Sequence, residues 1–461
     1  MKKIFEDIYG YSHTVTNEIS RGGQGAVFRT TNANIALKLE IDCLNNEFKQ
    51  NQSGNDSFNK LRLLPIPEGI NLTLPIAPLK EYSGYTMTLL SDMESFSSAF
   101  DVEYQEEMHM NDWLKNIATS SEECARDFTT YMLSGGARKR LKAYLRAATI
   151  LSQLHMNGLV YCDFSPNNIF VSSNKELTNV WMIDADNLNY QNETVKSGIY
   201  TPLYGAPEVV QGKGCTMYSD VYSFAISLFW QITRNHPFKG ALLEASFDDD
   251  FVDDVDEKVN KGEFPWVLDE EDDSNHIQTP IPAELVLNKK IISLLNRTFS
   301  EEGRKKRITR PTIYEWCSAI AESLDSMVEC SCCNMNYDRE EFDICPWCDN
   351  SEKMIVIRSF DTKDELVGKY YTEIKKGTLT NIPLRLVKGF FVSEVESDLF
   401  ELMFANDKVF ATNFNANYTF ENLSNSMFKF MSGRVEIQNG TKISCSDEKT
   451  GQVIVLEVSI S

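Results

Sequence analysis

The sequence is short of positive charge, and this shortage argues against one broad class of function. It holds 45 lysine and arginine residues against 67 aspartate and glutamate residues, which gives a formal net charge of −22 at pH 7. Binding to nucleic acid or to an anionic membrane over a large surface needs an excess of lysine and arginine, because phosphates repel an acidic protein. We therefore expect no nucleic-acid partner and no membrane partner, while a small local basic site stays compatible with this composition.

Long apolar runs are also missing. The densest one, around residues 221–232, is shorter than the roughly 20 residues that a membrane-spanning helix needs. The opening segment, "MKKIFEDIYG", holds lysines but no apolar core of signal-peptide length. The sequence contains no repeats and no low-complexity tract. We therefore expect a soluble, cytoplasmic protein.

Cysteine is present but unevenly distributed. Five of the 11 cysteines lie in the segment "CSCCNMNYDREEFDICPWC", and the others are scattered, which is typical of a metal site plus buried thiols rather than of a disulfide framework. The segment contains two Cys-x₂-Cys pairs, Cys330 with Cys333 and Cys345 with Cys348, which is the spacing of a tetrahedral zinc ribbon. The alternative is a redox dithiol, but no thioredoxin-like pattern surrounds "CPWC". We predict a structural zinc site, with Cys332 as a spare thiol for the first pair.

The hydrophobic pattern divides the chain into regions of different texture. At 461 residues the chain is long enough for two to four domains. Residues 15–40 and 72–90 are strand-like, and we expect a helix with a polar interruption between them, over about 45–65. From about 136 to 350 the pattern is mostly helical. After Cys348 the segments become strand-like again, and Asn439-Gly440 is placed for a tight hairpin turn that needs positive φ at both residues.

Near the N-terminus, the chain combines two features that suit phosphate binding. The segment "EISRGGQGAVFR" places Gly22, Gly23 and Gly25 between two strands, where backbone N–H groups can approach phosphates closely. Glycines also serve purely conformational roles in hairpin turns. Lys38 follows inside the apolar strand "IALKLE", where it either reaches bound phosphates or extends harmlessly to solvent.

Farther along, two segments carry hard oxygen ligands. Asp163 and Asn168 flank "FSPN", and Asp184 ends the apolar strand-like segment "VWMID". Carboxylate and amide oxygens are ligands that Mg²⁺ prefers, with phosphate oxygens completing its shell. Each feature alone is commonplace, but a glycine turn, a strand lysine, Asp-x₄-Asn and a strand-end aspartate in this order predict a phosphoryl-transfer site.

The order and spacing of these segments resemble the eukaryotic-type (Hanks-type) Ser/Thr protein kinase family, as found in bacteria. The resemblance covers about residues 10–325. In this sequence, "SRGGQGAVF" resembles the family's glycine-rich loop, and "IALK" resembles its V-A-I-K strand. The segment "YCDFSPNN" resembles the H-R-D-L-x-x-x-N loop, and "IDAD" resembles the Asp-Phe-Gly site. The segment "YTPLYGAPE" resembles the family's Ala-Pro-Glu segment, and "SDVYSFA" resembles the helix that anchors the catalytic loop. The segment "RITRPTIYEW" resembles the one whose arginine pairs with the Ala-Pro-Glu glutamate.

The resemblance implies a role for each matched residue. Lys38 would hold the α- and β-phosphates of ATP, Asp163 would accept or orient the substrate's hydroxyl proton, and Asn168 and Asp184 would hold Mg²⁺. Glu47, the glutamate in the expected helix before its polar break, would pair with Lys38. Glu208, Asp220 and Arg310 would hold the fold. The ATP site would comprise Gly22, Gly23, Gly25, Val27, Ala36, Lys38, Glu47, the gatekeeper Met87 and the hinge residues Thr88, Leu89 and Leu90.

The sequence departs from the family pattern at several positions. Ser20 replaces the first glycine of the loop, and Cys162 replaces the arginine before the catalytic aspartate, which predicts activity that does not depend on a phosphate on the activation segment. Ser165 replaces a lysine that is frequent in Ser/Thr kinases. Ala185 and Asp186 stand where the family has phenylalanine and glycine; Asp186 either adds to the metal site or caps the following turn, and we predict the cap.

These observations predict an α+β protein with a bilobal protein kinase fold. We expect an N-lobe at 1–90, a C-lobe at 91–325, a Cys₄ zinc ribbon at 328–350 and a β-rich, sandwich-like interaction domain at 353–461. Because no phosphate or metal ligand is missing, we expect a protein kinase that uses ATP, Mg²⁺ and Zn²⁺, with serine or threonine favoured over tyrosine. The alternatives are a pseudokinase scaffold and a small-molecule kinase, and "YTPLYGAPE" argues against the latter. The motifs also resemble bacterial kinases associated with a von Willebrand A protein and a metal-dependent protein phosphatase, which implies partners of those kinds.

Overall fold

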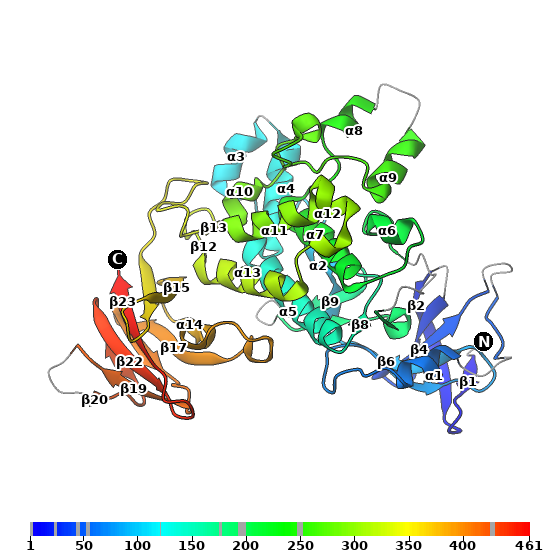
Figure 1. The fold of residues 1–461 in the computed structure, drawn as a ribbon, viewed down its shortest axis with the longest axis horizontal. Coiled ribbons are helices and arrows are strands. Elements are labelled where there is room, and N and C mark those ends of the chain that lie inside the picture. The colour runs from blue at the N-terminus through cyan, green and yellow to red at the C-terminus, as the bar shows by residue number, and fades with distance from the viewer. Residues whose placement is uncertain are drawn as a thin grey trace.

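A computed structural model gives the arrangement of the chain. It describes residues 3–22, 25–42, 47–51, 56–119, 121–174, 178–191, 200–246, 252–424 and 429–461. Figure 1 shows a small N-terminal sheet, a helical body and a C-terminal β region in succession, with the N- and C-terminal ends on opposite sides of the molecule. Among the described residues, none of the helices is both long enough and apolar enough for a membrane crossing.

The N-terminal sheet is antiparallel, with the strand order β1-β2-β3-β4-β6-β5. On β4, Leu37 and Leu39 pack in a small core with Phe5 and Leu79. Since side chains alternate along a strand, Lys38 between them points to the opposite face. The strands are β1 (Ile4–Glu6), β2 (Ser12–Arg21), β3 (Gly25–Thr30), β4 (Ile35–Glu40), β5 (Pro75–Pro78) and β6 (Gly84–Thr88).

The connection between β4 and β5 differs from the sequence prediction. We expected a helix with a polar interruption over about 45–65, but helix α1 occupies only Asp56–Arg62. Residues 47–51 are extended instead, with Phe48 and Gln50 each forming an isolated β-bridge. The rest of the predicted helix before α1, at residues 45, 46 and 52–55, lies outside the described residues.

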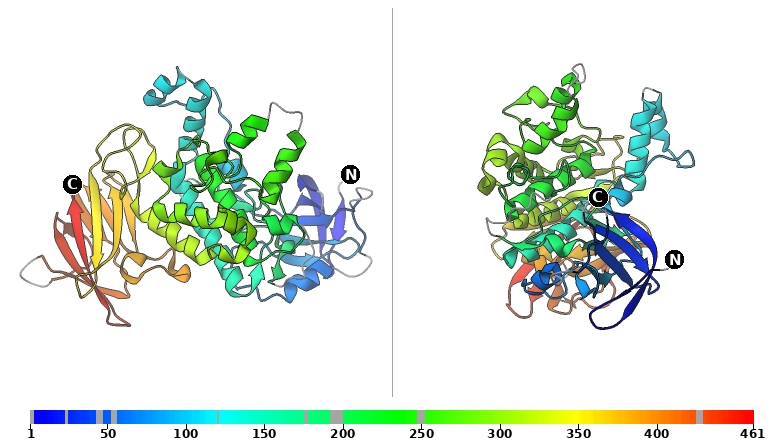
Figure 2. Two further views of the ribbon diagram at one scale, coloured as in Figure 1. Left: turned by 45° about the horizontal axis from the view of Figure 1, so that its top comes forward. Right: turned by 90° about the vertical axis from the view of Figure 1, so that its right-hand side faces the viewer.

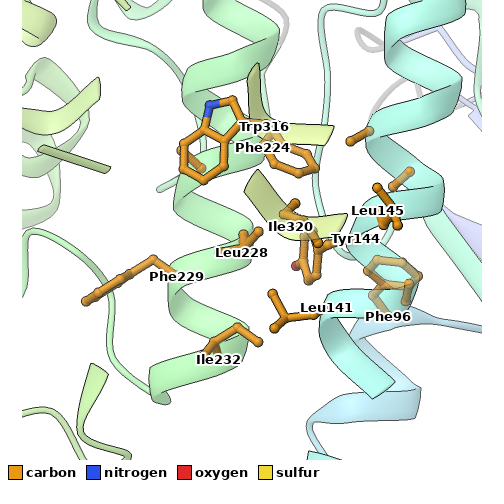
Figure 3. Packing of buried hydrophobic residues seen from close by; sticks show 14 of the residues in the cluster. Phe96, Leu141, Tyr144, Leu145, Phe224, Leu228, Phe229, Ile232, Trp316 and Ile320 are labelled. Atoms are coloured by element: carbon orange, nitrogen blue, oxygen red, sulfur yellow. The ribbon is translucent and has the colours of Figure 1, made fainter. Parts of the chain in front are cut away.

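Helices α5 (Gly136–Met156), α7 (Met217–Thr233) and α13 (Ile313–Ser326) form the centre of the helical body. Their aromatic side chains meet edge to face: Phe224 lies 5.6 Å from Tyr144 and 5.6 Å from Trp316, between ring centroids (Figure 3). The other helices are α2 (Phe96–Phe100), α3 (Asp112–Ala118), α4 (Glu122–Leu133), α6 (Pro207–Val210), α8 (Ala241–Ser246), α9 (Val252–Lys261), α10 (Ala283–Val286), α11 (Lys289–Phe299) and α12 (Glu301–Lys305).

Two small sheets on this body carry the loops with the predicted catalytic residues. One has the order β10-β9-β7 and the other pairs β11 with β8. The chain between β8 and β9 holds residues 161–168, and the chain after β10 reaches Asp184. The strands are β7 (Met93–Ser95), β8 (Leu159–Val160), β9 (Ile169–Ser172), β10 (Val180–Met182) and β11 (Asn189–Tyr190).

After the helical body come a short hairpin and two further sheets. The hairpin pairs β12 (Met327–Glu329) with β13 (Asn336–Asp338). The sheets have the orders β15-β14-β23-β22-β19-β20 and β16-β17-β18-β21, and they share one hydrophobic core, as in a β-sandwich. The elements are β14 (Met354–Phe360), β15 (Leu366–Glu373), β16 (Leu379–Pro383), α14 (Arg385–Lys388), β17 (Asp398–Ala405), β18 (Lys408–Thr412), β19 (Tyr418–Asn422), β20 (Lys429–Phe430), β21 (Val435–Ile437), β22 (Thr441–Asp447) and β23 (Val453–Ile460).

The turn at Asn439-Gly440 is tight, but it does not make the predicted hairpin. The strands on either side of it, β21 and β22, belong to different sheets. Only Gly440 has positive φ, at 80°, and the N–H of Thr441 donates to the carbonyl of Gln438. One glycine at the third position fits a turn of type II, which carries the chain from one sheet to the other.

A buried ion pair fixes the segment after residue 200 to the end of the helical body. The Arg310 guanidinium donates two hydrogen bonds to the Glu208 carboxylate, at 2.8 and 2.9 Å, and a third to the carbonyl of Gly303. The Arg310 side chain is 0% exposed. This pair was expected to be structural, and its geometry agrees with that role.

Removing one partner of this pair should be strongly destabilising. We expect Arg310→Leu to lower the free energy of unfolding by about 3–5 kcal/mol, because the Glu208 carboxylate would stay buried without its counter-charge. Thermal unfolding of the full chain measures the effect. The double variant Glu208→Leu/Arg310→Leu should recover part of the loss. If Arg310→Leu had a free energy of unfolding within about 1 kcal/mol of the wild type, the Arg310–Glu208 pair would contribute no more than an ion pair exposed to solvent.

Candidate functional site

The N-terminal sheet sets several predicted ATP-site residues in register. Val27 on β3 lies opposite Lys38 on β4, and Ala36 on β4 lies opposite Met87 on β6. Because residues two apart on a strand share a face, Ala36 and Lys38 point the same way. The predicted hinge residues follow directly: Thr88 ends β6, and the Leu89 N–H donates to the carbonyl of Asn34, with Leu90 next in the chain.

The glycine turn lies at the edge of the same sheet. Gly22 and Gly25 close the turn between β2 and β3, with the Gly22 N–H donating to the Gly25 carbonyl at 2.9 Å. A Cβ at position 25 would lie 2.7 Å from the backbone oxygen of Leu39, so this position excludes other residue types. The predicted Gly23 falls outside the described residues.

Asp220, near the start of α7, holds the loop that carries Asp163. Its carboxylate accepts hydrogen bonds from the backbone N–H groups of Tyr161, at 2.7 Å, and Cys162, at 2.8 Å, and it contacts His155 Nε2 at 3.0 Å. Cys162 has a positive φ of 74°, a conformation that is strained for residues other than glycine. The hydrogen bond from the Cys162 N–H to Asp220 helps to hold this conformation. The predicted structural role of Asp220 is confirmed by these bonds.

Asp163 itself lies between two residues, from different parts of the chain, that donate hydrogen bonds to it. Oδ1 accepts from the Thr201 hydroxyl at 2.8 Å and from the Thr201 N–H at 2.9 Å. Oδ2 accepts from Asn168 Nδ2 at 3.1 Å. Burial raises the pKa of Asp163, although the bonds from Thr201 and Asn168 oppose this effect. A carboxylate with a raised pKa and a hydroxyl at hydrogen-bond distance has the chemistry of a general base.

Lys38 contacts two carboxylates of the segment that follows β10. Its Nζ lies 3.0 Å from Asp184 Oδ1 and 2.8 Å from Asp186 Oδ2. Burial favours the neutral amine, but the charges of Asp184 and Asp186 outweigh it and raise the pKa of Lys38. Lys38 therefore stays cationic. The structure thus brings together two segments that lie 146 residues apart in the sequence.

Asp186 does not act as the predicted turn cap. The short helical turn Ala185–Asn187 begins after Asp184, and no side chain caps it. The Asp186 carboxylate points to the sheet instead: Oδ1 accepts from the Tyr85 hydroxyl at 2.8 Å and Oδ2 pairs with Lys38. The prediction was wrong because the sheet supplies partners with opposite charge and a free hydroxyl, which the local turn does not.

Glu47 was predicted as the acidic partner of Lys38, on a helix. It lies instead on the extended segment 47–51, and its side chain is exposed. Among the described residues, the ion pairs of Lys38 go to Asp184 and Asp186. The sequence argument required a helix at this point, and the chain forms β-bridges there.

The residues present fit a magnesium–nucleotide complex. Asn168 Nδ2 donates hydrogen bonds to the backbone carbonyl and to the carboxylate of Asp163. The other side-chain atom, Oδ1, is therefore the one that can ligate a cation. Asp184 carries a carboxylate that is one third exposed. Amide and carboxylate oxygens of this kind are what Mg²⁺ takes from a protein when phosphates complete its shell.

The cysteine cluster is a second candidate site. The Sγ atoms of Cys330, Cys333, Cys345 and Cys348 all lie within 4.8 Å of one another, and two of the pairs are 3.6 Å apart. A regular tetrahedron with Zn–S bonds of about 2.3 Å places sulfurs about 3.8 Å apart, so this set fits a zinc ion. Cys332 is exposed and does not belong to the group.

The two cysteine pairs have the same backbone form. Each is followed by a residue in the left-handed region, Asn334 at φ 60° and Asp349 at φ 58°. In each, the N–H of that residue donates to the carbonyl of the first cysteine, at 2.9 Å. This repeated turn points both thiols of a pair to one side, which is what a shared metal requires.

The cluster is packed against helices of the body. Trp113 Nε1 and Asn111 Nδ2 donate to the carbonyl of Cys333 at 3.2 and 3.3 Å. The ring of Phe128 on α4 lies edge to face with both Trp113 and Trp347. Figure 2 shows α3 and α4, in cyan, standing out from the body, and these contacts join them to the cysteine segment.

Buried His236 lies beneath the segment after Thr201 and is neutral. Its Nε2 lies 2.9 Å from the Leu203 carbonyl, and its Nδ1 accepts from the Phe238 N–H. Nε2 therefore carries the proton. Burial lowers the pKa of His236 to about 4. The hydrogen bond to Leu203 and the charge of Asp256 oppose this change, and the charge of Lys239 adds to it.

This histidine should make the protein less stable in mild acid. Since the unfolded chain binds the proton near pH 6.5 and the folded chain only near pH 4, the unfolded state gains protons first as the pH falls. The free energy of unfolding should therefore drop by about 2 kcal/mol between about pH 7 and about pH 5. We expect His236→Gln to flatten this dependence in thermal unfolding at several pH values. An unchanged slope in the variant would exclude His236 as the cause.

Comparison with known proteins gives the class to which this geometry belongs. The family model described as the protein kinase domain matches residues 93–319. Over these residues, which form both helices and strands, the chain is therefore similar to a protein kinase domain.

The similar proteins are serine/threonine protein kinases. Over 242 residues the chain is 23% identical to the probable serine/threonine-protein kinase PknB of Lactococcus lactis, covering 52% of this chain and 33% of the relative. It is 24% identical over 235 residues to the serine/threonine-protein kinase mos of Patiria pectinifera, and the match covers 49% of this chain and 59% of the relative. It is 26% identical over 171 residues to the serine/threonine-protein kinase dkf-2 of Caenorhabditis briggsae, and the match covers 34% of this chain and 13% of the relative. The chain thus spans less than two thirds of each relative, and each relative is named as a serine/threonine protein kinase.

Sequence reasoning missed three residues that the structure places in the site. Tyr85 bonds to Asp186, Thr201 bonds to Asp163, and Trp113 bonds to the cysteine segment. The register of β4 and β6 would have pointed to Tyr85, since it lies directly opposite Lys38. Thr201 and Trp113 meet their partners across long stretches of chain, and their surroundings in sequence give no signal of this.

Proposed function

We propose that the chain is an ATP- and Mg²⁺-dependent protein kinase that transfers the γ-phosphoryl group to serine or threonine hydroxyls of a protein, itself included. One observation carries this proposal: the Asp163 carboxylate, next to Asn168, accepts a hydrogen bond from an aliphatic hydroxyl, that of Thr201, at 2.8 Å. A serine or threonine acceptor would need the same contact to lose its proton. The relatives' names support the choice of serine and threonine over tyrosine.

The other residues have complementary roles in this proposal. Lys38 binds phosphate oxygens, while Asn168 and Asp184 hold Mg²⁺, which neutralises charge on the transferring phosphoryl group when bound. Val27, Ala36 and Met87 line the nucleotide site from the sheet, and residues 88–90 border adenine. Asp220 keeps the Asp163 loop in place through its two backbone bonds.

The regions beyond the kinase domain have separate proposed roles. The four-cysteine cluster holds a structural Zn²⁺, because a closed set of four thiolates leaves no coordination position for substrate. The strands over 353–461 form an interaction domain. On the motif resemblance, the setting is a bacterial signalling or stress/defence system in the cytoplasm, with a von Willebrand A protein and a metal-dependent phosphatase as partners.

Incubation of purified protein with γ-labelled ATP and Mg²⁺, alone and with a generic protein acceptor, tests the proposal. We expect label on protein, with phosphoserine or phosphothreonine at the mapped positions. Phosphotyrosine would overturn the acceptor assignment. Binding of ATP without any transfer, with and without acceptor, would favour a pseudokinase scaffold over an enzyme.

A further inference from the structure

The contacts of Asp186 assign it a task of its own, at a position where the family pattern has glycine. We propose that Asp186 is the positioning residue for Lys38: it holds the ammonium group on the phosphates of bound ATP, in place of a glutamate from an N-lobe helix. This inference rests on the proposed function, since it concerns how the same site grips its nucleotide.

Both oxygens of the Asp186 carboxylate have a partner on the sheet. Oδ2 lies 2.8 Å from Lys38 Nζ, and Oδ1 accepts from the Tyr85 hydroxyl at 2.8 Å. Lys38 and Tyr85 are cross-strand neighbours on β4 and β6, so their side chains project from the same face of the sheet. The carboxylate is therefore held in one orientation by two groups whose own spacing is fixed by the strand register.

Burial makes a lasting partner for Lys38 necessary. The Lys38 side chain is 12% exposed, and a cation so far removed from water is costly unless an anion stays beside it. Asp184 is the other carboxylate in contact, at 3.0 Å, but it is also the residue suited to ligate Mg²⁺. When Asp184 serves the metal, Asp186 is the carboxylate that still holds Lys38.

The arrangement links two tasks to one short segment. Asp184 and Asp186 flank Ala185, which is buried, so the metal ligand and the lysine partner move as one piece. In the family pattern the corresponding ion pair joins the strand lysine to a separate helix, and the position of that helix controls activity. Here both carboxylates that pair with Lys38 come from the segment after β10, and Tyr85 on the neighbouring strand orients one of them.

Direct binding measurements with ATP and adenosine test this role. Adenosine has no phosphates, so a residue that acts through Lys38 should change the affinity for ATP but not the affinity for adenosine. We expect Asp186→Asn to lower the ratio of ATP to adenosine affinity about 10-fold and kcat/KM for ATP about 100-fold. Tyr85→Phe should lower the ratio about 5-fold. Asp186→Glu, which keeps the charge, should recover most of the loss, and Asp364→Asn, an exposed aspartate in the β14–β15 turn, should match the wild type.

Each outcome decides the proposal. An Asp186→Asn variant with the wild-type affinity ratio would overturn it, and so would a larger loss from Glu47→Gln than from Asp186→Asn. Equal losses for ATP and adenosine would show a merely structural role and would also overturn it. If the wild type binds ATP but transfers no phosphate, the proposed function fails, while the affinity ratio still decides whether Asp186 positions Lys38.

Discussion

Replacing Asp163 by asparagine should abolish phosphoryl transfer while leaving nucleotide binding intact. The amide has nearly the shape of the carboxylate, so the loop held by Asp220 should keep its form. It cannot take up the proton of the acceptor hydroxyl, and loss of a positioned general base costs about 10²–10⁴-fold in kcat. Transfer of labelled phosphate to a protein acceptor at saturating ATP measures the effect, with ATP affinity determined separately on the same preparation.

Two comparisons make this experiment decisive. Asp364→Asn makes the same chemical change at an exposed turn position with φ 62°, a conformation that asparagine accepts, and should keep full activity. Thermal unfolding should show that Asp163→Asn is folded at the assay temperature, with a midpoint lowered only by the lost hydrogen bond to Asn168 or Thr201. An Asp163→Asn variant with at least a tenth of the wild-type kcat would mean that Asp163 does not act as the base.

Removing zinc from the four-cysteine cluster should have the largest effect on stability. Structural zinc contributes about 10–16 kcal/mol of binding free energy in small domains, and this energy is lost as folding energy when the metal leaves. We expect Cys333→Ser to abolish bound zinc and to lower the unfolding temperature, because Cys333 also presents its carbonyl to Trp113 and Asn111. Elemental analysis gives the zinc content per chain, and hydrogen exchange reports whether β12 and β13 lose protection.

The chain offers a matched control for this substitution in the adjacent residue. Cys332 is exposed and stands outside the cluster, so Cys332→Ser should keep one zinc per chain and the wild-type unfolding temperature. If Cys332→Ser lost zinc as Cys333→Ser does, the ligand set would be different from the one described. If neither protein contained zinc but both were equally stable, the cluster would not be a structural metal site.

Short motifs with fixed spacing are what the sequence alone allows one to predict. The residues around Asp163, Asn168 and Asp184 follow strands, and the cysteine pairs close local turns, so their geometry is dictated within a few residues. The strand alternation around Lys38 likewise predicts that this side chain points away from the core of Leu37 and Leu39. Such local rules account for most of the candidate site.

The features that escaped prediction depend on contacts between distant segments. Asp186 turns to Lys38 and Tyr85, rather than capping its own turn, because the sheet lies above it. Residues 47–51 become extended because Ile41 and Tyr82 offer bridge partners. The turn at Asn439-Gly440 joins two sheets because β21 pairs with β18, which no local pattern specifies.

The contacts across residue 326 also decide which fragment of the chain can be studied alone. The match to the kinase domain ends at residue 319, yet Asp325 forms a two-pronged ion pair with Arg385, and Arg138 on α5 pairs with Glu373 at 3.0 Å. A protein cut after residue 326 would expose Phe128 and leave the Trp113 donor unpaired. The smallest piece that keeps these groups satisfied therefore runs through the cysteine segment and into the β region, and a fragment trimmed to the kinase match is expected to aggregate.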